Sequence, residues 1–118
     1  MKFGVQYYPS HWPESQWAED AALMLQAGVK FVRMGDLSWS AYEPSSGQLD
    51  FCWMKRAIAL FGDRGIRTIL CTCSRTPPPW LYRARPELLP VDPHGVTRFA
   101  DGRYAVGMAH PSFVEEAQ

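Results

Sequence analysis

Apolar and polar positions follow two different periods along this chain. Residues 3–8 (FGVQYY), 29–34 (VKFVRM) and 66–71 (IRTILC) are short segments rich in β-branched and aromatic residues, as is typical of strands. Residues 14–27 and 51–63, which separate them, carry apolar side chains at helical spacing. The pattern therefore predicts a strand–helix–strand–helix–strand order, with parallel strands and right-handed crossovers.

Start and stop signals flank both predicted helices. Pro13 stands where the first helix can begin, and Gly28 follows its end. Asp50 is a candidate N-cap of the second helix, which Gly65 follows. The apolar faces expected to enter the core are Trp17, Ala21, Leu23, Met24 and Leu25 in the first helix and Trp53, Ala57, Leu60 and Phe61 in the second.

The remaining segments have the composition of turns and short elements. Residues 40–50 contain proline, glycine and serines, which predicts an irregular loop. After the third strand the chain is proline-rich, with a short helix expected over residues 80–85. We further expect a small hairpin over residues 96–106 and a new helix that opens at Pro111. The sequence shows no internal repeat beyond the strand–helix period, and no linker divides it.

A three-stranded parallel sheet has two bare edges and needs helices on both faces. The sequence ends inside the helix that opens at Pro111, and no fourth strand follows it. We therefore expect residues 1–118 to form part of a larger α/β domain.

Composition and charge exclude several classes of partner. The 118 residues are 47% hydrophobic, enough for one small domain with a core. Twelve basic and twelve acidic residues cancel, which argues against nucleic acid or an anionic membrane as a partner. The sequence has no apolar run of membrane-spanning length, and its first residues lead us to expect no signal peptide. Three cysteines, an odd number, favour a reduced, cytoplasmic setting.

Candidate chemistry lies after the first and second predicted strands. Arg33 stands at the carboxyl end of the second strand, the edge where parallel α/β sheets place their sites. Burying an arginine requires a partner, so either an anion faces it or its guanidinium reaches water, and a structural salt bridge is the favoured interpretation from this position alone. His11 and Trp12 either line a ligand cleft or fold over the core as a cap.

Two acids after the second strand could in principle act as an acid/base pair. Asp36 and Glu43 belong to the same crossover, so the loop would have to bring them to opposite sides of one substrate. A helix cap and a surface acid are the favoured interpretation.

Several ordered segments resemble one known family. GVQYYPSHWPESQW, AGVKFVRMGDLSWSAYEPSSGQLDF, TPPPWL and PELLPVDPHG are similar to the opening of glycoside hydrolase family 42, the β-galactosidases. The resemblance runs from Gly4 to about Val114. It implies a (β/α)8 barrel with further domains behind it, of which this chain would supply the first three strands and the start of the third helix. The alternatives are another barrel glycosidase acting on a different β-linked sugar, and a non-catalytic sugar-binding module.

The resemblance also implies which groups this chain lacks. Retaining glycosidases of this kind use two glutamates about 5 Å apart. In the family the acid/base follows an asparagine after the fourth strand, and the nucleophile follows the seventh. No Asn–Glu pair occurs in the sequence. We therefore assign no catalytic residue to this chain and expect both glutamates beyond Gln118. The implied substrate is a galactoside, no cofactor is needed, and the full-length protein is open to forming a homo-oligomer.

Binding residues carry over by position. Arg33 matches an arginine beneath the family's nucleophile, where it would keep that carboxylate ionised. Arg103 matches an arginine that touches the galactose hydroxyls, which suit the fixed fork of a guanidinium. Tyr8, Trp12 and Trp80 are weaker candidates for walls of the sugar site, because aromatic faces stack on pyranose rings but are more often core.

Two positions depart from the family pattern. The family usually has glutamate where Asp36 stands, so a contact carried over there would start from a shorter side chain. Many members carry a zinc-binding cysteine where this sequence has Gly107. The other candidate zinc ligands are Cys71, Cys73, His94 and His110, which show no complete tetrahedral spacing. We predict no zinc.

Overall fold

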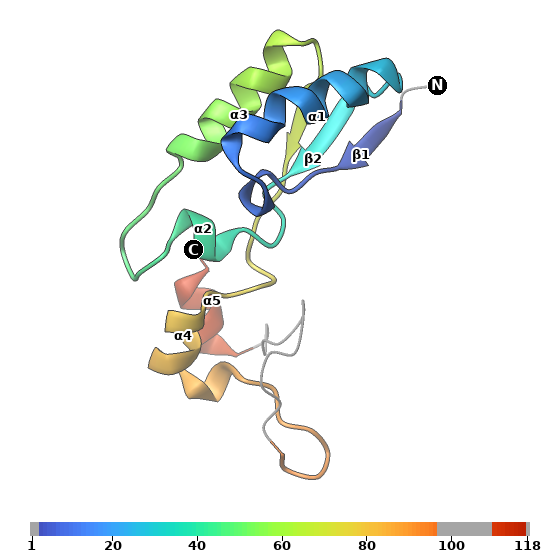
Figure 1. The fold of residues 1–118 in the computed structure, drawn as a ribbon. Coiled ribbons are helices and arrows are strands. Elements are labelled where there is room, and N and C mark those ends of the chain that lie inside the picture. Colours follow the sequence, from blue (N-terminus) through green and yellow to red (C-terminus); the bar gives the residue numbers. More distant parts are fainter. Residues whose placement is uncertain (1–2, 97–109, 118) are drawn as a thin grey trace. The chain divides into compact units, whose positions relative to one another are not determined.

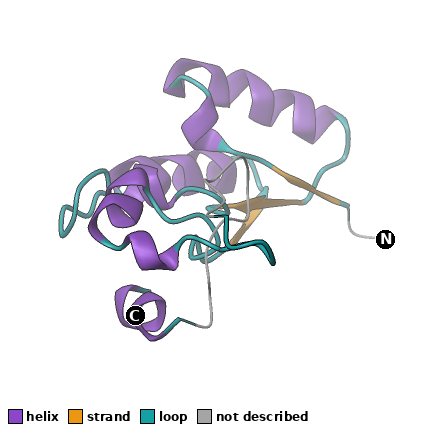
Figure 2. Ribbon diagram, turned by 90° about the horizontal axis from the view of Figure 1, so that it is seen from below, coloured by secondary structure: helices purple, strands orange, loops and turns teal. Residues whose placement is uncertain are grey.

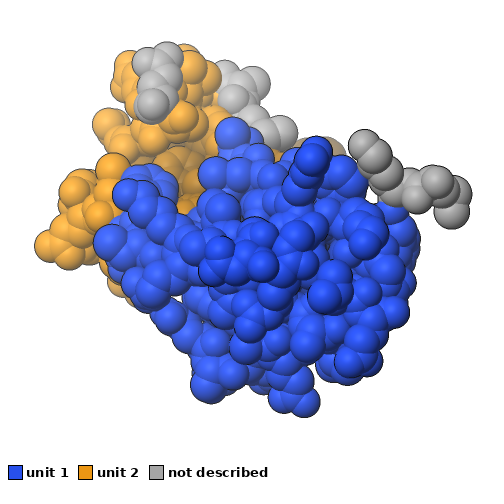
Figure 3. Space-filling model, turned by 90° about the horizontal axis from the view of Figure 1, so that it is seen from above, with its two compact units in different colours: residues 1–36, 50–72 blue, residues 37–49, 73–118 orange. Residues whose placement is uncertain are grey.

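The computed structural model describes residues 3–96 and 110–117 of the chain. The chain divides into two compact units, shown in different colours in Figure 3. Unit 1 comprises residues 1–36 and 50–72, and unit 2 comprises residues 37–49 and 73–118. The assignment of residues 1–118 to one partial domain stays a prediction.

Unit 1 contains a three-stranded parallel sheet with two helical crossovers. The strands are β1 (Gly4–Gln6), β2 (Phe31–Met34) and β3 (Arg67–Leu70), in that spatial order. The crossovers are α1 (Glu14–Gln26) and α3 (Cys52–Asp63), which lie side by side over the sheet in Figure 1, and Figure 2 shows the strands together in orange. The predicted parallel βαβαβ order is confirmed. Each strand is shorter than the segment predicted for it from the sequence.

The register gives the sheet two different faces. Val32 lies between Val5 and Thr68, and Arg33 lies between Gln6 and Ile69. Val32 and Met34 are 0% exposed, whereas Arg33 between them is exposed. Because successive side chains of a strand point to opposite faces, the apolar pair and the arginine serve opposite sides of the same strand.

The buried stripes of the two helices are narrower than predicted. Trp17 and Ala21 are buried in α1, but Leu23 and Leu25 are 57% and 42% exposed, so their assignment to the core was wrong. At 100° per residue Leu23 lies about 160° around the helix from Ala21, on the far side of the buried stripe. In α3 the buried residues are Met54, Ala57 and Phe61, while Trp53 and Leu60 are half-buried.

The glycines after both helices act as expected, whereas the N-cap of α3 is Phe51 and not Asp50 as predicted. Gly28 and Gly65 have φ values of 79° and 76°, a left-handed conformation that glycine adopts without steric cost after a helix. Asp50 Oδ1 accepts a hydrogen bond of 2.8 Å from the N–H of Cys52, the first residue of α3. The carboxylate thereby satisfies one of the donors left open at the start of a helix.

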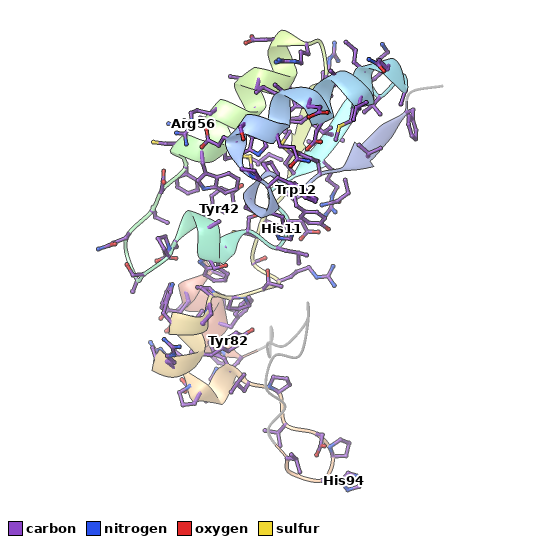
Figure 4. The ribbon with its side chains drawn as sticks, viewed as in Figure 1. His11, Trp12, Tyr42, Arg56, Tyr82 and His94 are labelled. Carbon is purple, nitrogen blue, oxygen red and sulfur yellow. The ribbon has the colours of Figure 1, made fainter. Side chains whose placement is uncertain are left out.

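An exposed ion pair joins the two helices. Arg56 of α3, labelled in Figure 4, donates from Nε to Glu14 Oε2 over 3.0 Å and from Nη2 to Glu14 Oε1. Hydrogen bonding to Arg56 lowers the pKa of Glu14. The ion pair links the first turn of α1 to the second turn of α3 at their exposed surface.

Unit 2 is built from short helical pieces. They are α2 (Trp39–Tyr42), α4 (Pro79–Ala84), a 3₁₀ turn at Pro86–Leu88 and α5 (Pro111–Glu116). Its core consists of Trp39, Leu81, Leu88 and Phe113, with Cys73 and Trp80 packed against it.

The predicted elements of unit 2 are confirmed only in part. The helix ended by Pro86 and the helix opened by Pro111 are present. The segment 40–50 was wrongly predicted to be irregular throughout, because it begins inside α2, a helix too short to show a periodic signal. The predicted hairpin over residues 96–106 falls almost entirely on residues that lie outside the described ranges.

The first prediction concerns Tyr7, whose ring packs 5.2 Å from that of Phe61 and whose hydroxyl donates to Asp20 Oδ2 over 2.6 Å. The ring is 6% exposed, and burial followed by the Asp20 hydrogen bond raises the pKa of Tyr7. A raised pKa in the folded state contributes stability that is present below the unfolded pKa of about 10 and is lost as the pH rises beyond it. We expect the free energy of unfolding to fall above about pH 10.

Tyr7→Phe removes the ionisable hydroxyl and its hydrogen bond to Asp20. In urea denaturation at pH 7 it should lower the free energy of unfolding by about 1–3 kcal/mol. Above about pH 10 the difference from wild type should shrink, because only the wild type still has Tyr7 to ionise. Parallel pH curves for the two proteins in the alkaline range would contradict the assignment.

Candidate functional site

The carboxyl ends of the three strands meet at one edge of the sheet. The ladder continues one step past the strands, since the N–H of Tyr7 donates to the carbonyl of Arg33 over 3.0 Å and that of Cys71 to Met34 over 2.8 Å. This aligned edge is where parallel α/β folds gather their functional groups.

Arg33 is the charged centre of this edge. Its Nη1 donates to Gln6 Oε1 over 2.6 Å and to Asp36 Oδ2 over 3.1 Å. The Arg33 side chain is 47% exposed and that of Asp36 is 14% exposed. The sequence left open whether an anion faces the guanidinium or the guanidinium reaches water, and both are the case. The favoured structural ion pair is present, yet it occupies only one nitrogen of the group.

The chain leaves β2 through an unusual turn. Gly35 has a φ of 91° and Leu37 a φ of 61°, so left-handed backbone lies on both sides of Asp36. A leucine in this region costs roughly 1–2 kcal/mol. Such strain gathers at sites where a side chain must be held in one place. Here the turn contains Asp36, the residue that pairs with Arg33.

Aromatic side chains follow β1 at the same edge. Tyr8 is half-buried and its ring stacks on that of His11, with centroids 5.1 Å apart and planes inclined by 13°. Trp12 is 50% exposed, so it does not fold over the core as a cap. Figure 4 shows His11 and Trp12 together in the loop before α1. The loop is anchored because Trp17 Nε1 donates to the carbonyl of Pro9 over 3.1 Å.

Glu43 has a different role from the one expected. Its Oε2 accepts from Trp39 Nε1 and its Oε1 from the N–H of Gly47, both over 2.8 Å. Its backbone carbonyl accepts from Trp80 Nε1 over 2.9 Å. Glu43 is therefore a half-buried acceptor and not the surface acid that was expected. Because its two carboxylate oxygens hold two donors and Asp36 is held by Arg33, the geometry does not favour an acid/base pair of Asp36 and Glu43.

The other sequence-predicted residues are distributed as follows. Arg103 and Gly107 lie outside the described residues. Trp80 is half-buried in unit 2, with its indole N–H held by Glu43. Within residues 3–96 and 110–117, no group of three or more His, Cys, Asp or Glu side chains is placed to hold a metal ion. The absence of zinc stays a prediction. No helix in these ranges combines the length and apolar character needed to cross a membrane.

Sequence reasoning missed Gln6. This residue is the register partner of Arg33 and accepts its shortest described hydrogen bond. The signal was present in principle, because Gln6 and Arg33 each stand near the end of an apolar run in neighbouring parallel strands. The two side chains come into contact only because of the register between β1 and β2. The sequence of one short strand does not determine that register.

Comparisons with known proteins agree along the whole chain. The family model described as β-galactosidase, glycoside hydrolase family 42, matches residues 6–118. A β-galactosidase from Thermus thermophilus is 43% identical over 115 residues, which cover 98% of this chain and 18% of that protein.

Solved structures give the same result. The structure of a β-galactosidase from the haloarchaeon Halorubrum lacusprofundi matches with a TM-score of 0.93 and 41% identity, over 99% of this chain and 18% of that one. A β-galactosidase from the psychrophilic Marinomonas ef1 matches with a TM-score of 0.92 and 39% identity over the same shares. These likenesses confirm the predicted fold class, the N-terminal portion of a (β/α)8 barrel. The chain spans less than a fifth of the length of these relatives.

A second prediction tests the role of Glu43. Glu43→Ala leaves the buried indole of Trp39 and the N–H of Gly47 without their carboxylate acceptor, and should lower the free energy of unfolding by about 2–4 kcal/mol. Glu43→Gln keeps one acceptor oxygen and should lose less. Urea denaturation followed by tryptophan fluorescence measures both. Equal losses for the two variants would show that the carboxylate is not the acceptor that matters.

Proposed function

The chain belongs to glycoside hydrolase family 42, the β-galactosidases, and we propose that it supplies the first three βα units of the catalytic barrel of a retaining β-galactosidase. The complete enzyme would hydrolyse terminal β-D-galactosides by double displacement, with both glutamates outside residues 1–118. It would act in the cytoplasm and need no cofactor. The observation that carries the proposal is the family match over residues 6–118.

The edge around Arg33 supports this proposal. In (β/α)8 barrels the reacting groups stand at the carboxyl ends of the strands, where Arg33 lies. A guanidinium beside the nucleophile favours its ionised form by charge and by hydrogen bonding. Only an ionised carboxylate can attack the anomeric carbon. Arg33 would therefore act on the carboxylate and not on the sugar.

The residues proposed to contact the sugar differ in their exposure and in whether their polar atoms are already hydrogen-bonded. Trp12, with half of its surface exposed, offers an aromatic face at the carboxyl edge, and Tyr8 stacked on His11 stands beside it in the chain. Trp80 has its N–H engaged and would offer only a ring face. Arg103 is proposed to bind the galactose hydroxyls through its forked donors.

A second candidate is a barrel glycosidase acting on a different β-linked sugar. The observation that favours it is Asp36, since the family usually has glutamate there. The shorter side chain is drawn to Arg33 at 3.1 Å, which would leave a sugar hydroxyl expected at this position without that acceptor. A panel of chromogenic β-glycosides separates the two candidates.

The third prediction concerns activity. Residues 1–118 alone should not hydrolyse a chromogenic β-galactoside, because the sequence contains no Asn–Glu pair for the acid/base and the nucleophile is expected beyond Gln118. The complete product of the gene that carries this chain should hydrolyse it. Turnover by residues 1–118 above a matched blank, abolished by Asp36→Asn, would overturn the proposal in favour of a local acid.

The fourth prediction is made for Arg33→Met in the complete enzyme. The substitution keeps the apolar stem and deletes the charge, so the nucleophile should be protonated more often at neutral pH. We expect a large fall in the glycosylation rate, a small change in KM, and an upward shift of the acidic limb of the pH–rate profile.

Arg56→Met is the matched control for this variant. It removes an arginine of similar exposure, 55% against 47%, from an ion pair between helices. It should leave the pH–rate profile unchanged. If Arg33→Met also keeps the wild-type profile and full activity per folded site, Arg33 is an ordinary structural ion pair.

A further inference from the structure

A neutral amide contacts the cation at the strand edge. Gln6 Oε1 accepts from Arg33 Nη1 over 2.6 Å, and the two residues are register partners in β1 and β2. A guanidinium can only donate hydrogen bonds, so the contacting atom of the amide must be its oxygen. The orientation of the amide follows, and its Nε2 points away from Arg33.

In that orientation the amide nitrogen of Gln6 is left without a hydrogen-bond acceptor in the described part of the chain. Gln6 Nε2 is buried and has no hydrogen-bond partner among the described residues. An unsatisfied buried donor of this kind is strongly unfavourable, and a structure that retains one calls for an explanation. Glutamate in the same place would have no donor to leave unpaired and would add an ion pair to Arg33. The second oxygen of that glutamate, however, would take the buried place of Nε2 and would lack a donor there, so burial alone does not decide between the acid and the amide.

Charge accounts for the amide. Arg33 carries one positive charge, and Asp36 already supplies one negative charge 3.1 Å away. A second carboxylate at position 6 would give the cluster a net negative charge. A further carboxylate approaching Arg33 would then be repelled, whereas the amide holds the guanidinium without adding charge.

The two contacts also determine which nitrogen atoms of Arg33 can still donate a hydrogen bond to another group. Nη1 has two hydrogens, and the two acceptors Gln6 and Asp36 use both. The Nε and Nη2 atoms donate to no described residue. These two atoms form the edge of a guanidinium that binds a carboxylate through two parallel hydrogen bonds.

We propose that Gln6 is a positioning residue, which turns the Nε–Nη2 edge of Arg33 toward a carboxylate without adding a second negative charge beside it. The inference rests on the proposed function, in which that carboxylate is the nucleophilic glutamate. Gln6 acts through Arg33 and touches neither the sugar nor the reacting atoms.

The test uses the complete enzyme and two variants of Gln6. Gln6→Glu keeps the shape and the contact to Arg33 but adds a charge. It should shift the acidic limb of the pH–rate profile upward and lower kcat about tenfold or more near neutral pH. Gln6→Met removes the contact without adding charge. It should lower kcat about tenfold, with KM nearly unchanged and a smaller shift of the acidic limb.

The controls separate charge at this edge from charge elsewhere. Gln26→Glu makes the same change in charge at the end of α1, which leads to the opposite, amino edge of the sheet. It should keep the wild-type profile. The described titratable side chains on the segments that leave the strands at the edge of Arg33 include Tyr7, Tyr8, His11, Asp36 and Cys71, and all are the same in the two Gln6 variants.

Each outcome supports or overturns the inference. If Arg33→Met moves the acidic limb but Gln6→Glu is more stable to heat and keeps the wild-type kcat and profile, Gln6 is only structural. If Gln6→Met fails to fold, Gln6→Glu still decides through its pH profile. If Arg33→Met itself has no effect, the inference falls together with the role of Arg33. A complete enzyme without β-galactosidase activity overturns the proposed function first, and the inference with it.

Discussion

The parallel pairing of β2 on both of its edges is the constraint on which unit 1 depends. The strand is hydrogen-bonded to β1 on one side and to β3 on the other, so its side chains can point only to one face of the sheet or the other. Val32 and Met34 are directed to the buried face, and Arg33 is thereby directed away from it. The position of the arginine is a consequence of burying its two apolar neighbours.

The same pairing brings the polar groups of the edge together. Gln6 reaches Arg33 because the parallel register pairs the two residues across β1 and β2. Asp36 reaches Arg33 because it stands three residues further along, between the left-handed residues Gly35 and Leu37. One acceptor is charged and one is neutral, so the guanidinium is held on two sides while only one negative charge stands beside it. A carboxylate site can be prepared in this way by residues that carry no catalytic role themselves.

In unit 2, residues from the segments that resemble the family have a packing role. Trp39, Glu43 and Trp80 all belong to segments that resemble the family, and hydrogen bonds between the two indoles and Glu43 tie them together. A buried indole requires an acceptor for its N–H, and the proline-rich segment after β3 offers few regular backbone partners. In this part of the chain, the residues of the segments that resemble the family are packing residues.

The sequence by itself determined the order of elements, the parallel sheet, the two crossover helices with their glycine ends, and the place of Arg33 at the end of β2. These depend on period, capping and turn chemistry, which are local and therefore legible in one chain. Only the tertiary structure decided that Leu23 and Leu25 of α1 are exposed, that Glu43 is an acceptor for Trp39, and that Gln6 meets Arg33. Each of these depends on which segment lies opposite, and register and packing between distant residues leave no periodic trace in the sequence.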